Sequence, residues 1–352
     1  MSNAATPTWP DILSHLVTGH HLDSLRAGWA MNQVLSGDAT PAQIAGFMVA
    51  LQAKGVTPDE LSGLVTGMLD NARPLALPTR DAVDIVGTGG DRANTVNVST
   101  MAAIVAAAAG AKVVKHGNRA ASSACGTADC LEALGVALDV PPERQGQVLD
   151  AAGIVFLFAP AYHPSLRHAA APRRELGIRT PFNFLGPLAN PAQPTAAALG
   201  VADPRMAPIM ADVLAGRGVR GLVFHGGDGL DELTTTTDSA VWVVTGGAVT
   251  ETRLDPAHLG IGRADKESLV GGDPAHNAAV VRATFAGEAG PVRDIVLLNA
   301  AAALLAHDGP AEDVTLADQF APQLARAAAA VDSGAATALL QRWVEASQAA
   351  KV

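Results

Sequence analysis

The feature that most constrains this fold is a short β-branched run that ends in a glycine loop and leads into an alanine-rich helix. The run is Val83-Asp84-Ile85-Val86, and the loop is Gly87-Thr88-Gly89-Gly90-Asp91. The sequence then predicts a helix over residues 98–109 and a second strand over residues 112–114. Strand, loop, helix and strand in this order form the βαβ unit of a largely parallel sheet.

Later segments extend the same pattern. Strands are predicted at residues 153–156 and 221–224, and residues 241–251 are typical of a β-hairpin around Gly246-Gly247. The C-terminal part is mostly helical, most clearly over residues 295–306 and 318–331. We therefore expect the α/β class, with a mostly parallel central sheet, over residues 78–352.

The segment before residue 78 has a different texture. Thr40-Pro41-Ala42-Gln43 is a capping box with proline at the first helical position, and Thr57-Pro58-Asp59-Glu60 repeats it. Apolar residues follow each box at helical spacing. This predicts a small helical domain over residues 1–77, with a later helical contribution near residues 163–190.

Composition narrows the class of function. A length of 352 residues favours two domains. Lys plus Arg number 24 and Asp plus Glu number 34, so the net charge is −10, which argues against nucleic-acid binding. The spacing of Cys125 and Cys130 fits neither a zinc site nor a redox motif, so a reducing compartment is expected.

Targeting signals are not evident either. No Lys or Arg precedes Arg26, and the longest apolar run, residues 101–111, is too short to span a bilayer. We expect a cytoplasmic protein with neither a nucleic-acid nor a membrane partner.

The glycine loop is a candidate anion site. Glycines let backbone N–H groups approach an anion closely, and the helix start at Asn97-Val98-Ser99-Thr100 adds partial positive charge. Together these features suit a pyrophosphate. The loop is neither a Walker A sequence nor a dinucleotide fingerprint, and taken alone it is equally typical of a tight βα turn.

A polar segment, Lys115 to Ser123, follows the second predicted strand. It holds two cations, an imidazole, an amide and two hydroxyls at the carboxyl end of a parallel strand, where open α/β sheets bind ligands. The alternative is a solvated polar loop. That alternative is weakened because two consecutive strand ends carry residues compatible with phosphate.

Two further segments carry charge. Asp231 and Glu232 are adjacent in a loop, where carboxylates can converge on one hard cation such as Mg²⁺. On this segment alone a solvated acidic turn is favoured. Arg173-Arg174 precedes a stretch rich in proline and glycine, and an arginine there can grip a carboxylate with two hydrogen bonds. Surface arginines on a helix are an equal alternative.

Taken in order, these segments resemble the anthranilate phosphoribosyltransferases, a family of tryptophan biosynthesis. The resemblance rests on GTGGD, NVST, KHGNRAASS, FNFLGPLANP and DGLDEL, and it extends from residues 43–47 to residues 293–300. It implies a fold like that of pyrimidine nucleoside phosphorylases, with a small helical domain hinged to an α/β domain, usually in a homodimer. It also implies transfer of phosphoribosyl from phosphoribosyl pyrophosphate (PRPP) to the amino group of anthranilate, with Mg²⁺, two ions being expected.

The resemblance further implies roles for matching positions. PRPP would be held by Gly87, Gly90, Asp91, Thr95, Asn97, Val98, Ser99, Thr100, Lys115, His116, Gly117, Asn118, Arg119, Ala120, Ala121, Ser122, Ser123 and Thr127. Gly87, Asn118 and Arg173 would bind anthranilate, and Ser99, Asp231 and Glu232 would ligate Mg²⁺. Lys115 and His116 are the catalytic candidates. The sequence departs from the family at Arg92, where glycine is common.

Two rival functions remain. A nucleoside phosphorylase shares the fold and a reaction at the ribose anomeric carbon, although Asn118 and Arg173 in their motifs favour anthranilate. A non-catalytic relative that binds nucleic acid is disfavoured by the net charge and by the complete set of proposed Mg²⁺ ligands.

Overall fold

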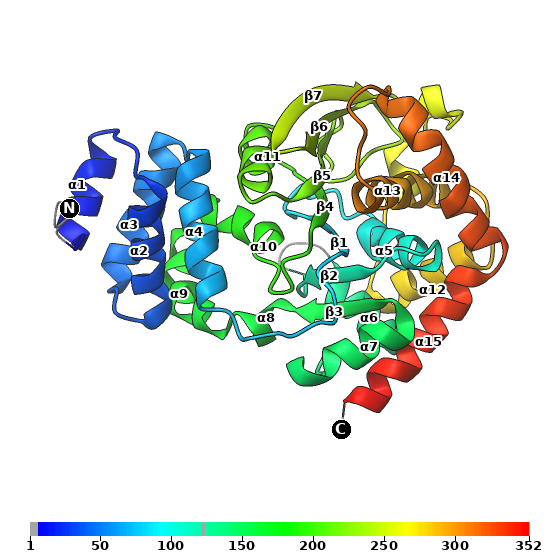
Figure 1. The fold of residues 1–352 in the computed structure, drawn as a ribbon, viewed down its shortest axis with the longest axis horizontal. Helices are drawn as coiled ribbons and strands as arrows, with labels where there is room; N and C mark the ends of the chain where they lie inside the picture. The colour runs from blue at the N-terminus through cyan, green and yellow to red at the C-terminus, as the bar shows by residue number, and fades with distance from the viewer. Residues whose placement is uncertain (1–5, 121–123, 352) are drawn as a thin grey trace. The chain divides into compact units, whose positions relative to one another are not determined.

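The computed structural model describes residues 6–120 and 124–351, which form two compact units (Figure 1). One unit comprises Met1–Arg73 and Pro160–Pro191, and the other comprises Pro74–Ala159 and Ala192–Val352. Among the described residues, no helix combines the length and the apolar character that crossing a membrane would require.

The first unit is helical. Its helices are α1 (Trp9–Val17), α2 (Ser24–Ser36), α3 (Pro41–Lys54), α4 (Pro58–Asp70), α8 (Ala159–Tyr162), η2 (Pro164–Leu166), α9 (Arg167–Leu176), η3 (Pro181–Phe184) and α10 (Leu185–Leu188). Both capping boxes are confirmed: Thr40 and Gln43 bond reciprocally at the start of α3, as do Thr57 and Glu60 at the start of α4. These bonds satisfy backbone N–H groups that a helix start otherwise leaves unpaired.

The second unit contains a seven-stranded sheet of order β3-β2-β1-β4-β5-β6-β7. Its strands are β1 (Val83–Gly87), β2 (Val113–Gly117), β3 (Ile154–Phe158), β4 (Ala196–Gly200), β5 (Arg220–Gly226), β6 (Ser239–Thr245) and β7 (Ala248–Leu254). The pairs along β3, β2, β1, β4 and β5 are parallel, whereas β6 runs antiparallel to both of its neighbours, β5 and β7. The predicted fold class, helical plus α/β with a mostly parallel sheet, is confirmed.

Helices cover this sheet and complete the second unit. They are α5 (Val98–Ala108), α6 (Thr127–Leu134), η1 (Pro142–Arg144), α7 (Gln145–Ala152), α11 (Met206–Gly216), η4 (Pro256–Leu259), η5 (Lys266–Leu269), α12 (Pro274–Phe285), α13 (Pro291–Asp308), α14 (Leu316–Asp332) and α15 (Ala335–Ala350). Helix α13 packs on β1, β4, β5 and α5, whereas α11 packs on β5, β6 and β7 (Figure 1). Helix α13 is buried over residues 295–306, which are apolar except for Asn299.

Strand β4 is absent from the sequence-based expectations. Its residues, Ala196-Ala197-Ala198-Leu199-Gly200, contain no β-branched side chain, so their intrinsic preference gives no strand signal. All five residues are buried, and the strand pairs with β1 on one side and β5 on the other. Tertiary hydrogen bonding therefore overrides local preference here, and small side chains let α13 approach the sheet.

Candidate active site

The sheet has a topological switch point between β1 and β4. The chain leaves β1 through α5 toward β2, and it leaves β4 through α11 toward β5 on the other side. Open α/β sheets bind ligands in the crevice that such a reversal creates at the carboxyl ends of the strands. The last residues of the two strands, Gly87 and Gly200, are direct register partners.

These two glycines make room for Asp231. A Cβ atom at Gly87 would lie 2.1 Å from Oδ2 of Asp231, and one at Gly200 would lie 1.6 Å from its backbone oxygen. The backbone N–H of Gly89 donates to Oδ2 of Asp231 at 2.6 Å. The glycine loop after β1 and the acidic loop after β5 (residues 227–236) therefore meet at the switch point.

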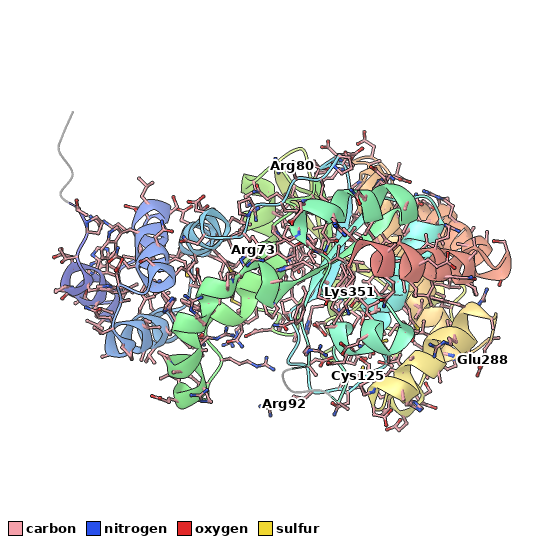
Figure 2. The ribbon with its side chains drawn as sticks, turned by 90° about the horizontal axis from the view of Figure 1, so that it is seen from below. Arg73, Arg80, Arg92, Cys125, Glu288 and Lys351 are labelled. Carbon is pink, nitrogen blue, oxygen red and sulfur yellow. The ribbon has the colours of Figure 1, made fainter. Side chains whose placement is uncertain are left out.

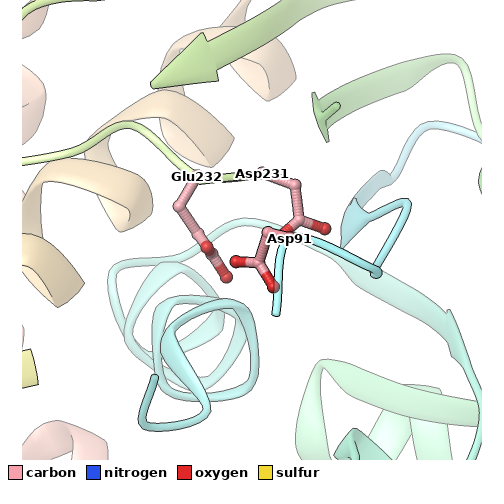
Figure 3. Close-up of side chains that lie close together, drawn as sticks. All are labelled: Asp91, Asp231 and Glu232. Atoms are coloured by element: carbon pink, nitrogen blue, oxygen red, sulfur yellow. The ribbon is translucent and has the colours of Figure 1, made fainter. Parts of the chain in front are cut away.

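Three carboxylates converge there. Asp91, Asp231 and Glu232 each offer an oxygen, and these oxygens lie within 4.8 Å of one another (Figure 3). Asp231 and Glu232 are the residues that the sequence assigns to a metal. Asp91, which the sequence assigns to PRPP, lies in the same cluster. The GTGGD motif alone does not show that Asp91 shares a site with Asp231 and Glu232, because these residues are far apart in the chain.

The cluster is electrostatically strained without a cation. Burial, and secondarily the nearby charge of Asp91, raises the pKa of Asp231 to about 7. Burial and the charge of Asp231 raise the pKa of Glu232 well above its usual range. Oε2 of Glu232 is buried without a hydrogen-bond partner among the described residues. Crowded, unpaired carboxylate oxygens match the ligands that Mg²⁺ prefers, so the residues present fit this ion.

Lys115 supplies a buried cation beside the cluster. Its side chain is 1% exposed, and Nζ donates to the backbone oxygen of Ile85 at 2.5 Å and to Oγ of Ser99 at 3.2 Å. Burial lowers the pKa of Lys115 to about 8, and the carboxylates of Asp84, Glu232 and Asp231 partly oppose that shift. Strand β2 thus places a cation whose pKa is about 8 next to Ser99 at the start of α5.

The start of α5 is held by an amide network. Oδ1 of Asn97 accepts from Nδ2 of Asn277 at 2.8 Å and from Sγ of Cys125 at 3.3 Å, and Nδ2 of Asn97 donates to the backbone of Cys125. Just before it, Thr95 forms a β-bridge with Val270. Sequence reasoning missed Asn277, which lies in α12 and has no local motif. Of the next three predicted PRPP residues, Val98 and Thr100 are buried in the first turn, and Ser99 between them is partly exposed.

The loop after β2 is tied to α6. Arg119 donates through its guanidinium to Asp129 at 2.8 Å and Glu132 at 2.9 Å, so this side chain is paired with protein carboxylates. The backbone N–H of Ala120 also donates to Asp129. Gly117 ends β2, and Thr127 begins α6. The predicted residues Ala121, Ser122 and Ser123 lie outside the described residues.

Side-chain oxygens accept hydrogen bonds from backbone N–H groups at the end of β2 and in the loop that follows it. The backbone N–H of His116, a buried residue, donates to Oδ1 of Asp84 at 3.2 Å. Oδ1 of Asn118 accepts from the backbone N–H of Arg119 at 2.7 Å.

In the glycine loop after β1, Gly90 has a φ of 83°, a left-handed conformation that favours glycine. Arg92, also in the glycine loop after β1, is exposed (Figure 2). It has a φ of 63°.

Arg173 lies in α9 of the helical unit. It is half-buried, and burial lowers the pKa of its guanidinium. Within residues 6–120 and 124–351 its guanidinium has neither a hydrogen-bond nor an ion-pair partner. A half-buried cation without a protein counterion is suited to a ligand carboxylate.

Comparison with known proteins gives family matches for both units. The model of the glycosyl transferase family a/b domain matches residues 79–337, and that of the glycosyl transferase family helical bundle domain matches residues 10–72. The chain is 60% identical to the anthranilate phosphoribosyltransferase of Acidothermus cellulolyticus, over 99% of this chain and 98% of that one.

Solved structures agree. The anthranilate phosphoribosyltransferase from Thermus thermophilus has a TM-score of 0.89 and 43% identity, covering 96% of this chain and 99% of that one. The Saccharomyces cerevisiae enzyme in complex with PRPP and Mg has a TM-score of 0.87 and 26% identity, covering 99% of each chain.

Proposed function

Because this chain belongs to the anthranilate phosphoribosyltransferase family, which transfers the phosphoribosyl group of PRPP to the amino group of anthranilate, we propose that the reaction occurs at the switch point between β1 and β4. The observation that carries this proposal is the convergence of Asp91, Asp231 and Glu232 beside the glycine loop. These carboxylates would hold a divalent cation, and the neighbouring backbone N–H groups of the loop would donate to an anion.

The metal would be held by Asp231 and Glu232, with Asp91 beside them and Ser99 as a ligand to a second ion. When bound, Mg²⁺ neutralises charge on the pyrophosphate group of PRPP. The remaining assignments are those that the family resemblance implies. The glycine loop and the start of α5, Gly87 to Thr100, would donate to the phosphates, and the segment Lys115 to Thr127 would enclose the rest of PRPP.

The transfer would proceed by direct displacement. The bond from C1 of ribose to pyrophosphate breaks, the bond from C1 to the anthranilate nitrogen forms, and that nitrogen loses a proton. Lys115 would stabilise the negative charge on the departing pyrophosphate. The aromatic amine is neutral near pH 7 and needs no strong base, so His116 would position it or accept its proton late.

Anthranilate would be bound by Asn118, Gly87 and Arg173. Support comes from the chemistry of Arg173, whose half-buried guanidinium has no protein counterion among the described residues. The planar guanidinium can hold a carboxylate with two parallel hydrogen bonds, which fixes the orientation of the aromatic ring.

We also propose that the protein acts as a cytoplasmic homodimer that uses two Mg²⁺ ions. The dimer and the ion count rest on the family resemblance. The free thiols of Cys125 and Cys130 are compatible with a reducing compartment.

The test is the loss of anthranilate fluorescence in the presence of purified protein, PRPP and Mg²⁺. Decay should require all three components, and omission of any one should leave a flat trace. A flat trace from folded protein with all components present would contradict the proposal. Phosphate-dependent cleavage of thymidine or uridine would then favour the nucleoside phosphorylase alternative.

A further inference from the structure

We propose that Asn299 is a positioning residue for Glu232: its side-chain amide clamps the backbone of Leu233 and thereby sets where the metal-binding carboxylate points. This inference rests on the proposed role of Asp231 and Glu232 in Mg²⁺ binding. Asn299 lies in the middle of α13, outside both loops of the site, and it is not expected to touch PRPP, anthranilate or metal.

The clamp is formed by three hydrogen bonds. Oδ1 of Asn299 accepts from the backbone N–H of Leu233 at 3.0 Å, and Nδ2 donates to the backbone oxygen of Leu233 at 2.8 Å. Nδ2 also donates to the backbone oxygen of Ile295 at 2.8 Å, one helical turn earlier. The contact with Ile295 requires the NH₂ group on that side, so it fixes the orientation of the amide.

The consequence for Glu232 follows from peptide planarity. The N–H of Leu233 belongs to the same rigid plane as the carbonyl of Glu232, so holding that N–H restricts the backbone torsion that precedes it. This torsion sets the direction of the Cα–Cβ bond of Glu232 relative to that plane, and the side chain extends from this bond. Oε2 of Glu232 has no hydrogen-bond partner among the described residues, so no hydrogen bond at that oxygen orients the carboxylate, and the fixed backbone limits where it can point.

The clamp connects the acidic loop to the core. The loop also braces itself, because Oδ2 of Asp228 accepts from the hydroxyls of Thr234 at 2.8 Å and Thr236 at 2.5 Å. Those bonds join parts of one loop to each other. Asn299 instead joins the loop to α13, which packs on β1, β4 and β5. The carboxylate is thereby placed relative to the strand ends that carry the glycine loop.

The burial of the Asn299 amide supports a role in holding Leu233. Asn299 is 1% exposed, and the other buried residues of α13, from Ile295 to Ala306, are apolar. Burying an amide costs free energy unless its hydrogen bonds are made, so the helix core by itself favours a leucine there. The hydrogen bonds to Leu233 explain why an amide side chain stands at this buried position.

The test uses Asn299→Leu, which keeps the branched shape and the number of side-chain heavy atoms but removes the clamp. The melting temperature is measured with excess PRPP and no anthranilate while Mg²⁺ is titrated, so no turnover contributes. Loss of a residue that orients a metal ligand typically weakens metal affinity 10- to 100-fold. We expect the Mg²⁺ midpoint to rise at least about tenfold, and steady-state turnover to recover at high Mg²⁺.

Ser347→Ala is the matched control. Ser347 is also 1% exposed, and its Oγ accepts from the backbone N–H of Ala137 at 3.0 Å, but it lies in α15 and touches neither loop. It should lower the melting temperature without moving the Mg²⁺ midpoint. Asn299→Asp provides a second variant if the leucine variant does not fold. It keeps an oxygen that can accept from the N–H of Leu233, but it places its second oxygen against the carbonyl oxygens of Leu233 and Ile295.

The outcomes separate cleanly. A folded Asn299 variant with the wild-type Mg²⁺ midpoint, whatever its stability, overturns the positioning role and leaves Asn299 as a structural amide. A wild-type protein whose melting temperature does not respond to Mg²⁺ overturns the metal site itself, and the positioning role with it.

Discussion

The carboxyl end of β4 touches the acidic loop so closely that a Cβ atom at Gly200 would lie 1.6 Å from the backbone oxygen of Asp231. Because the obstacle is backbone, it cannot rotate away as a side chain would. A residue with a Cβ atom therefore does not fit at position 200 without a shift of the acidic loop. Gly200 pairs with Gly87 in the sheet, where Asp231 likewise leaves no space for a Cβ atom.

Gly200→Ala should displace the acidic loop. We expect a loss of about 1–3 kcal/mol of stability, as for other overpacked sites, together with a higher Mg²⁺ requirement. Gly216→Ala is the control, since a Cβ there meets nothing within 4 Å and the residue ends α11. Thermal unfolding and Mg²⁺ titration measure both effects; a normal Mg²⁺ response in Gly200→Ala would contradict the tight fit.

The carboxylate pair should make the metal-free protein less stable as the pH rises. The pKa of Asp231, about 7 in the folded protein against 3.8 unfolded, means that its favourable contribution is present below pH 4 and is lost as the pH rises through 7. Asp231→Asn combined with Glu232→Gln should raise the melting temperature of metal-free protein at pH 8, and not at pH 4.

The same double variant should weaken the Mg²⁺ dependence of turnover and use PRPP poorly. An unchanged Mg²⁺ titration curve would mean that these two buried carboxylates do not hold the ion.

Lys115 should impose an alkaline limit on PRPP use. Its pKa is lowered to about 8, so the free enzyme loses this cation as the pH rises through 8. The ratio kcat/KM for PRPP reports ionisation of the free enzyme, and it should fall above pH 8 and be flat just below. Lys115→Met should have a low kcat/KM without this decline. A wild-type profile that is flat to pH 10 would show that the charge of Lys115 is not needed.

Arg173→Ala should raise the KM for anthranilate far more than the KM for PRPP, because one substrate alone loses its carboxylate partner. A lost charge-assisted bidentate contact corresponds to roughly tenfold or more in affinity. Arg174→Ala is the adjacent control, since Arg174 is exposed on the same helix. Equal effects of Arg173→Ala on both KM values would remove Arg173 from the anthranilate site.

Arg92 should contribute a charge contact to PRPP. Both Arg92 and Asn94 have positive φ values, 63° and 52°, so replacement by glycine relieves backbone strain at either position. Only Arg92→Gly also removes a cation. We expect it to raise the KM for PRPP about fivefold, equivalent to roughly 1 kcal/mol, and less at high salt. If Asn94→Gly has the same effect, loop conformation and not charge is responsible.

Much of the local structure was set by the sequence because its causes are local. The capping boxes at Thr40 and Thr57 formed as predicted, since their hydrogen bonds join residues three apart. The hairpin around Gly246-Gly247 and the helix after the glycine loop formed for similar reasons. The motifs also identified the chemistry, and the family and its reaction follow from them. The domain limits 1–77 and 78–352 and the individual residue roles stay predictions.

The tertiary structure alone decided the assembly of the site. Strand β4 has no strand preference of its own, and its hydrogen bonds to β1 and β5 place it in the sheet. That placement brings Gly200 beside Gly87, and Asp91 beside Asp231 and Glu232. Such contacts depend on strand order and register, which a run of residues does not encode locally, so the carboxylate cluster and the clamp of Asn299 appear only once the sheet and α13 are packed.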